Sequence, residues 1–242
     1  MDLRSEIQNP RTAGDDLLRS MFALLDRHFG NVTWEGFVGD LLEKDWIILL
    51  YDESGELAGF STQMLREAAF EGKSYRAVFS GDTIVAPEHW GSLELQLTFA
   101  RLLERLRLQR PESPLYWFLI SKGFRTYRLL PLYFKEFYPC HFRETPAWER
   151  RLLTHLAEWK FPGAYDAEKG ILCFGGKSQF LKPPWSAIPE GRLESNPHVR
   201  FFANRNPGFT RGDELACLAE FRPENLSGFI LKRLEEVSLQ GV

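Results

Sequence analysis

The spacing of the apolar residues changes along the first half of the chain, and this change constrains the fold more than any other feature. In residues 15–29 and 34–42, apolar side chains recur every three or four positions, which predicts two amphipathic helices. Residues 46–51 are continuously apolar, and a polar turn separates them from extended chain at 57–65, which predicts a β-hairpin. Residues 74–85 alternate and predict a third strand, antiparallel to the second, with Val78, Asp82 and Ile84 on one face and Tyr75, Ala77, Phe79 and Thr83 on the other.

A long helix then links this third strand to a fourth. The helix predicted at 92–110 has a broad apolar face and a narrow polar stripe that contains Arg101 and Arg105. A short apolar strand is predicted at 115–120. A strand, helix, strand succession of this size favours a parallel crossover, so we expect an α/β (α+β) fold with a mixed, mostly antiparallel sheet flanked by helices.

The last hundred residues give weaker patterns. We expect them to form a C-terminal α/β extension, residues 141–242, that either packs on the domain of residues 1–140 or forms a second half. The elements expected after the fourth strand are a helix at 126–138, a helix at 148–159, strands at 171–174 and 199–203, a segment at 213–221 that fits strand or helix, and a last helix from Pro223 to about 237.

Composition excludes several classes of protein. The 242 residues include 30 basic and 33 acidic side chains, a net charge of −3, so no nucleic-acid partner is expected across the surface. Cys140, Cys173 and Cys217 are widely separated, which argues against a disulfide framework. The histidines show no metal-ligand spacing, so no metal is expected. No apolar run reaches the length of a membrane span and the start has no leader pattern, so we expect a cytoplasmic protein.

Two short sequences, together with the order of elements across residues 15–139, resemble one known family. The sequence DTIVAPEHWG at 82–91 is similar to an acidic strand end followed by Val-x-Pro-x-x-Arg-Gly, and LYFK at 132–135 is similar to Leu-Tyr-x-Lys. Both are features of the GCN5-related N-acetyltransferase (GNAT) superfamily. The resemblance covers about half of the chain. It implies a GNAT-like sheet with a V-shaped opening between the third and fourth strands beside Gly91, and transfer of an acyl group from a thioester to a small-molecule amine.

The resemblance also implies a site for the acyl donor in the turn after the third strand. Val85, Trp90, Gly91 and Ser92 lie at this turn, where free N–H groups of the next helix would bind the pyrophosphate of acyl-CoA. Leucines occupy positions 93 and 95, where the family has further glycines. For Ser92, an ordinary helix cap remains an equal alternative.

Such degenerate turns resemble the long-chain branch, which includes N-acyl amino acid and acyl-homoserine-lactone synthases. In that branch the donor can be the phosphopantetheine of an acyl carrier protein. Arg101 and Arg105 would then dock this acidic partner, although their stripe also fits a solvated helix face.

Acyl transfer to an amine requires a base and an acid. The resemblance implies Asp82 as the base and Tyr133 as the acid, and His89, beside the turn, is a further candidate proton carrier. Each has a structural alternative: a strand-end cap for Asp82, a core aromatic for Tyr133 and a surface turn for His89. The runner-up hypothesis for the whole chain is a catalytically inactive GNAT-fold module that binds a ligand or a protein.

Overall fold

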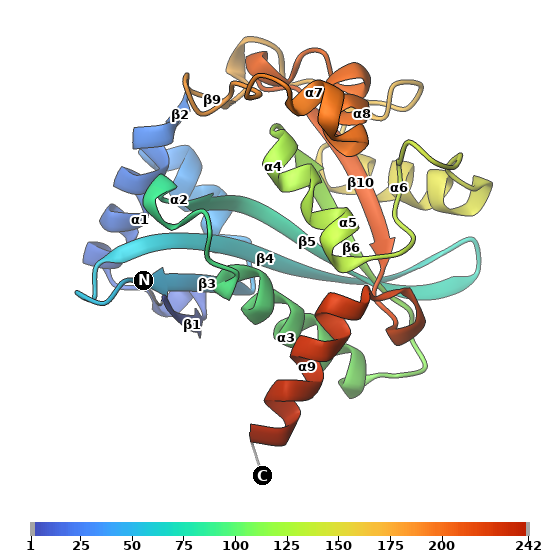
Figure 1. Cartoon of the computed structure of the whole chain (residues 1–242), viewed down its shortest axis with the longest axis horizontal. Helices are drawn as coiled ribbons and strands as arrows, with labels where there is room; N and C mark the ends of the chain where they lie inside the picture. Colours follow the sequence, from blue (N-terminus) through green and yellow to red (C-terminus); the bar gives the residue numbers. More distant parts are fainter. Residues whose placement is uncertain (1–2, 241–242) are drawn as a thin grey trace.

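The computed structural model describes residues 3–240, and within them eight strands form one mixed sheet (Figure 1). The strand order is β1-β3-β4-β5-β6-β10-β8-β7. Neighbouring strands are antiparallel except β5 and β6, which are parallel and joined by helix α3, so the expected crossover is confirmed. This is the GNAT-like architecture that the resemblance implies. The strands of the sheet and the separate β2·β9 pair are β1 (Arg4–Gln8), β2 (Phe29–Gly30), β3 (Trp46–Tyr51), β4 (Leu57–Phe70), β5 (Lys73–Val85), β6 (Leu115–Ser121), β7 (Tyr165–Asp166), β8 (Ile171–Leu172), β9 (Phe180–Leu181) and β10 (Glu214–Glu220).

Helices cover both faces of the sheet. One face packs against α3, α4, α5, α8 and α9 through a core that includes Phe99, Trp117 and Phe202. On the other face, α1 and α2 cover β3 and β4, whereas α6 covers β5, β6 and β10. The helices are α1 (Asp15–His28), α2 (Trp34–Leu42), α3 (Glu94–Gln109), α4 (Phe124–Tyr127), α5 (Leu129–Tyr133), α6 (Ala147–Lys160), α7 (Arg192–Ser195), α8 (Pro197–Arg205) and α9 (Gly228–Gln240).

A bulge in β5 decides the direction in which Asp82 points. Two residues of β5, Gly81 and Asp82, lie opposite the single residue Thr62 of β4. An extra residue shifts the alternation of side chains along a strand. From simple alternation we expected Asp82 on the face of Val78, and this was wrong. Val78 packs in the core that contains α3, whereas Asp82 lines a cavity on the opposite face together with Phe79.

The parallel strands β5 and β6 separate before they end. Their last paired residues are Ser80 and Leu119, although β5 continues to Val85 and β6 continues to Ser121. Beyond Ser80 and Leu119, the backbones of β5 and β6 are therefore not paired with each other. The V-shaped opening expected between the third and fourth predicted strands is present.

The C-terminal segment contributes strands to the same sheet. β10 pairs with β6 on one side and with β8 on the other, both antiparallel. The undecided segment 213–221 is thus a strand. The division of the chain into residues 1–140 and an extension stays a prediction.

The strand predicted at 199–203 was wrong, because this segment lies in helix α8. Asn196 caps the helix by accepting hydrogen bonds from the N–H groups of His198 and Val199. Val199 and Phe202, three positions apart, are the buried residues. A short apolar run fits either a strand or one side of a helix, and the cap and the packing decided for the helix.

The helix predicted at 126–138 is also shorter than expected. α4 and α5 end at Tyr133, and the chain beyond is extended enough for Tyr138 to form a bridge with Leu218 of β10. Pro131 lacks the N–H group that would bond to the carbonyl of Tyr127 in one continuous helix, which fits the break between α4 and α5.

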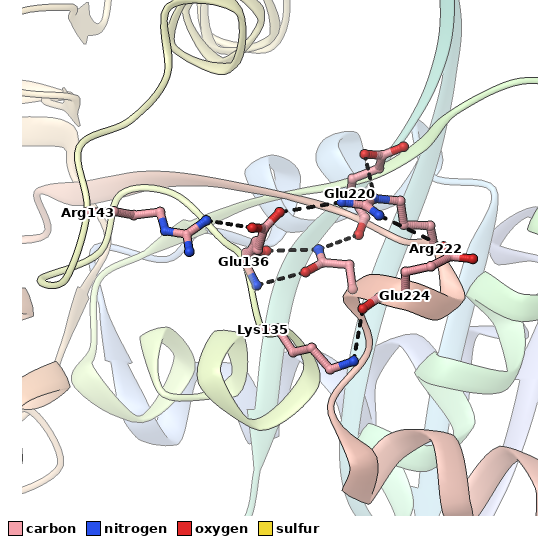
Figure 2. A network of polar contacts seen from close by, with 7 residues as sticks. Lys135, Glu136, Arg143, Glu220, Arg222 and Glu224 are labelled. Atoms are coloured by element: carbon pink, nitrogen blue, oxygen red, sulfur yellow. Dashed lines mark hydrogen bonds and ion pairs between the residues drawn. The ribbon is translucent and has the colours of Figure 1, made fainter.

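A polar network attaches the start of α9 to the rest of the molecule (Figure 2). Glu136 pairs with Arg143 at 2.6 Å and with Arg222 at 3.4 Å. The side-chain amide of Asn225 donates to the backbone oxygens of Glu136 and Glu220, at 2.9 and 2.8 Å. These contacts join the segment after α5, the end of β10 and the turn before α9, so the C-terminal helix is held against the sheet.

Candidate active site

A cavity of about 430 Å³ opens on the sheet face between α2 and α6, at the point where β5 and β6 separate. Its walls include Gly81 and Asp82 of β5 and Ile120 of β6. The four charged residues among those that line it are Asp40, Asp82, Lys122 and Glu214. The cavity has the size typical of small-molecule sites and contains ionisable groups, which makes it the candidate active site.

Asp82 is half-buried in the cavity wall, and its pKa is raised. Removal of the carboxylate from water is the largest cause, and the negative charge of Asp40 adds to it. The ammonium groups of Lys122, Lys44 and Lys160 act in the opposite direction. Among the side chains described within residues 3–240, none donates a hydrogen bond or forms an ion pair to this carboxylate. Asp82 therefore faces the cavity as a free proton acceptor that is more basic than an ordinary aspartate.

Glu214 places a second carboxylate in the same cavity. It is the first residue of β10, only 7% of its side chain is exposed, and its carboxylate lies 3.1 Å from the ammonium group of Lys122. Burial raises the pKa of Glu214, Lys122 lowers it, and the charge of Asp82 raises it further. Asp82 and Glu214 are thus close enough to interact electrostatically.

A third carboxylate, Asp40 of α2, lies at the rim within a cluster of ion pairs. Asp40 pairs with Lys44 at 2.5 Å and with Lys160 of α6 at 3.4 Å, and Lys160 also pairs with Glu43 at 2.6 Å. The pKa of Lys44 is lowered, because the effect of burial exceeds the opposing effect of the Asp40 carboxylate. The cluster ties α2 to α6 beside the ring of Phe79.

The sequence identified Asp82 but missed Asp40, Lys122 and Glu214. These residues lie on three segments with no local spacing to connect them. Two of them could have been found from the sequence, because each is a charged residue beside an apolar run that predicts a strand. Lys122 follows the run 115–120, and Glu214 precedes the run 215–219.

The turn between β5 and α3 contains the residues predicted to bind the acyl donor. The N–H groups of Trp90 and Ser92 are bonded within the turn, to the carbonyls of Pro87 and His89. The Ser92 hydroxyl accepts from the N–H of Glu94 at 3.2 Å, one residue before the N-cap position of α3, which Leu93 occupies. Within residues 3–240, no hydrogen bond to the N–H of Gly91 or Leu93 is formed, and a Cβ at Gly91 would meet open space. These two N–H groups are therefore among the backbone donors that remain for a ligand.

An acidic side chain weakens this turn as a phosphate site. Glu94 lies in the first turn of α3, where its carboxylate accepts from Ser5 at 2.6 Å and lies 3.6 Å from Arg101. A negative charge already interacts favourably with the helix N-terminus there, and it would repel a second anion. This turn is therefore a less favourable site for a pyrophosphate than a glycine-rich turn would be.

Trp90 and Arg125 form an aromatic and cationic pair beside the turn. The indole N–H of Trp90 donates to the carbonyl of Val85 at 2.8 Å. The guanidinium of Arg125 lies 4.1 Å from the centroid of the Trp90 ring, which is partly exposed, and it donates to the carbonyl of Trp185. His89 is half-buried in the turn. The roles of these residues toward a donor stay predictions.

Tyr133 lies on the opposite side of the sheet from Asp82. It is buried among Phe99, Trp117 and Phe134, and its hydroxyl donates to the carbonyl of Gln96 in α3. Burial raises the pKa of this hydroxyl well above its ordinary value. The structure thus gives Tyr133 a packing role, and its role as the acid stays a prediction.

Arg101 and Arg105, predicted to dock a carrier protein, line a groove between α3 and α9. The groove contains apolar side chains from both helices, among them Leu108 and Leu231. Arg101 is partly neutralised by Glu94, whereas Arg105 is exposed.

The described residues contain neither a cluster of metal ligands nor a membrane-spanning helix. Between Leu3 and Gln240, no group of three or more His, Cys, Asp or Glu side chains is placed to hold a metal ion. None of the helices in that range is long and apolar enough to cross a membrane.

No protein-family model matches the chain, and no curated protein matches it. Solved structures give weak similarities. A probable N-acyltransferase from Enterococcus faecalis is 17% identical with a TM-score of 0.42, covering 57% of this chain and 33% of that chain. A GNAT-family N-acetyltransferase (YhbS) from Escherichia coli, in complex with CoA, is 16% identical with a TM-score of 0.36, covering 50% and 65%. An N-myristoyltransferase from Saccharomyces cerevisiae with bound myristoyl-CoA is 17% identical with a TM-score of 0.39, covering 50% and 29%.

The chain spans about a third of the length of the Enterococcus protein. All three TM-scores are below 0.5, so these similarities do not assign an activity or a substrate. The inferences below depend on the geometry of the chain itself.

Proposed function

We propose that this protein is an N-acyltransferase that moves an acyl group from a thioester to an amine. One observation carries the proposal: β5 and β6 separate beside a cavity into which Asp82 presents an unpaired carboxylate of raised pKa. An amine is protonated at neutral pH and must lose a proton before it attacks a carbonyl. A carboxylate of increased basicity at a strand opening supports that step.

The proposed reaction has three stages. Asp82 takes one proton from the ammonium group of the acceptor. The nitrogen lone pair then attacks the thioester carbonyl, and the unpaired backbone edges beyond Ser80 and Leu119 offer N–H groups that stabilise the developing oxyanion. Finally the C–S bond breaks, and the leaving thiolate gains the second proton that the nitrogen loses. The products are an N-acyl amide and a free thiol.

The donor is proposed to be acyl-CoA or the phosphopantetheine of an acyl carrier protein. The free N–H groups of Gly91 and Leu93 support a phosphate contact for either donor, whereas Glu94 disfavours the doubly charged pyrophosphate of CoA. A carrier protein would supply additional contacts to Arg101 and Arg105. Reversing both arginine charges should raise KM for a carrier-protein donor and leave KM for acyl-CoA unchanged.

The test is turnover by the purified protein with acyl-CoA donors of increasing chain length and a panel of primary amines, detected as the N-acyl product by mass spectrometry. Asp82→Asn should lower kcat/KM about 100-fold or more, the range expected for loss of a general base. Glu144→Gln is the matched control, because Glu144 is exposed in the segment before α6 and does not line the cavity. Equal activity of Asp82→Asn and the control would refute Asp82 as the base.

The runner-up, an inactive GNAT-fold module, predicts a different outcome. Glu94 at the donor turn and the leucines at positions 93 and 95 are the observations that favour it. In that case no donor would be turned over, while a thermal shift on addition of acyl-CoA or an acyl carrier protein would still report binding.

A further inference from the structure

The walls of the candidate active site are largely aromatic. Phe29, Phe79, Phe161 and Phe174 line the cavity, and they come from β2, β5, the end of α6 and the segment after β8. Phe79 and Phe161 lie edge to face with their ring centroids 5.6 Å apart, and Phe161 and Phe174 do so at 5.4 Å. Such walls suit an apolar body and a nearby cation, because aromatic faces attract positive charge.

Of the carboxylates that line the same cavity, Asp82 is the one without an ion pair among the described side chains. Asp40, Asp82 and Glu214 are carboxylates, and Lys122 is the one ammonium group among the described side chains that line it. Lys122 is already paired with Glu214. Lys160, at the rim, is paired with Asp40 and Glu43. A second carboxylate brought in by a ligand would therefore find no unpaired cation among the described side chains.

A buried hydroxyl offers a further polar contact. Ser178 lines the cavity, is 3% exposed, and has a hydroxyl oxygen without a hydrogen-bond partner in the described part of the chain. A buried hydroxyl usually has a partner, and a ligand N–H group would provide one. The site thus combines aromatic walls, unneutralised negative charge and an unused acceptor.

We propose that this cavity binds a primary amine with an apolar, preferably aromatic, body as its ammonium ion, which contacts Asp82 and Glu214 while the body packs against the phenylalanines. The inference deepens the proposed function, since it takes this cavity as the acceptor site. It excludes free amino acids as preferred acceptors, because their carboxylate would be held close to Asp82 and Glu214. Glu214, from the C-terminal segment, becomes a specificity-determining residue.

The test is direct binding by isothermal titration calorimetry to the whole protein without any thioester donor. The probes are 2-phenylethylamine, phenylalanine and 2-phenylethanol, which share one aromatic body. The amine carries only the cation, the amino acid adds a carboxylate, and the alcohol is neutral. We expect the amine to bind at least about tenfold more tightly than either of the others, the factor that one charge-assisted hydrogen bond supplies.

Variants assign the effect to the two carboxylates. Asp82→Asn and Glu214→Gln should each weaken binding of 2-phenylethylamine about tenfold and leave binding of 2-phenylethanol unchanged. Glu144→Gln, at an exposed position outside the cavity, should change neither. Equal or tighter binding of phenylalanine to the wild-type protein would overturn the inference, and so would a wild-type affinity for the amine in Asp82→Asn.

The outcomes separate the inference from the proposed function. Selective amine binding without any acyl transfer would leave the inference standing and refute the transferase proposal. Acyl transfer to amino acids in preference to 2-phenylethylamine would support the transferase proposal and refute the inference.

Discussion

Arg76 should be one of the main determinants of stability in this fold. It lies in β5, is 2% exposed, and its guanidinium donates to the carbonyls of Leu106, Arg110 and Ser113 at 2.7, 2.7 and 3.0 Å. These carbonyls lie at the end of α3 and just beyond it, where the helix leaves carbonyl groups without intrahelical partners. One buried cation thus joins the C-terminus of α3 to the sheet.

The expected effect of Arg76→Met follows from these three bonds. Each hydrogen bond from a charged donor contributes about 1.5 kcal/mol or more, so the three together contribute about 4.5 kcal/mol. Release of the guanidinium from its desolvated position offsets part of this. We expect Arg76→Met to lower the free energy of unfolding by about 3 kcal/mol, which corresponds to a fall in Tm of about 6–12 °C for a chain of this size.

Urea denaturation followed by tryptophan fluorescence measures the change. Arg76→Lys keeps the charge but cannot reach three carbonyls in the same geometry, so it should fall between the wild type and Arg76→Met. Arg110→Gln is the control, because the Arg110 side chain is 57% exposed and its pair with Glu67 should contribute less than about 1 kcal/mol. A loss below about 1 kcal/mol in Arg76→Met would refute the argument that these bonds outweigh the desolvation of the cation.

Three further predictions concern the site and its surroundings. The pKa of Asp82 is raised in the fold, so wild-type stability should fall as pH rises from about 4, its unfolded value, through its folded value. Asp82→Asn should lose this dependence on pH. In urea titrations, it should be more stable than the wild type at pH 7 but not at pH 3. Tyr133→Phe should lower unfolding free energy by about 1 kcal/mol and leave kcat unchanged, because the hydroxyl is already bonded to a backbone carbonyl; a large fall in kcat would instead restore it as the acid. Gly30→Ala should destabilise the β2·β9 pair by about 1–3 kcal/mol, because its Cβ would lie 2.3 Å from the Phe180 ring. At Gly39, in α2, an added Cβ would meet no atom within 4 Å, so Gly39→Ala should stabilise the helix by about 0.5–1 kcal/mol. If both glycine variants changed the free energy of unfolding in the same direction, the packing described here would be contradicted.

Local patterns predicted the first half of the fold well. The start of α2 after Thr33, the β3–β4 hairpin and the β5–α3–β6 crossover all depend on signals within one element or one turn. The second half was less predictable, because its elements are short. The α8 segment contains too few apolar residues to show whether they recur with a helical or a strand spacing. The segment of β10 is identified as a strand only by its pairing with β6.

The candidate site was predicted in part. Asp82 was named from the resemblance of residues 82–91 to a family motif, and simple alternation along the strand assigned it to the wrong face. Tyr133 was named from a short pattern that does not encode where its hydroxyl is bonded.

By itself, the sequence determined the periods of the longer elements and the parallel crossover, since each depends on residues that are neighbours along the chain. Its resemblance to a known family nominated one carboxylate of the candidate site. Only the tertiary structure decided that a bulge turns Asp82 into the cavity and that Glu214 and Lys122 converge there. A bulge is defined by the register of two strands, and a pocket by side chains from segments far apart in sequence. The charge and the aromatic walls of this cavity, and therefore the acceptor proposed for it, are properties of the folded chain.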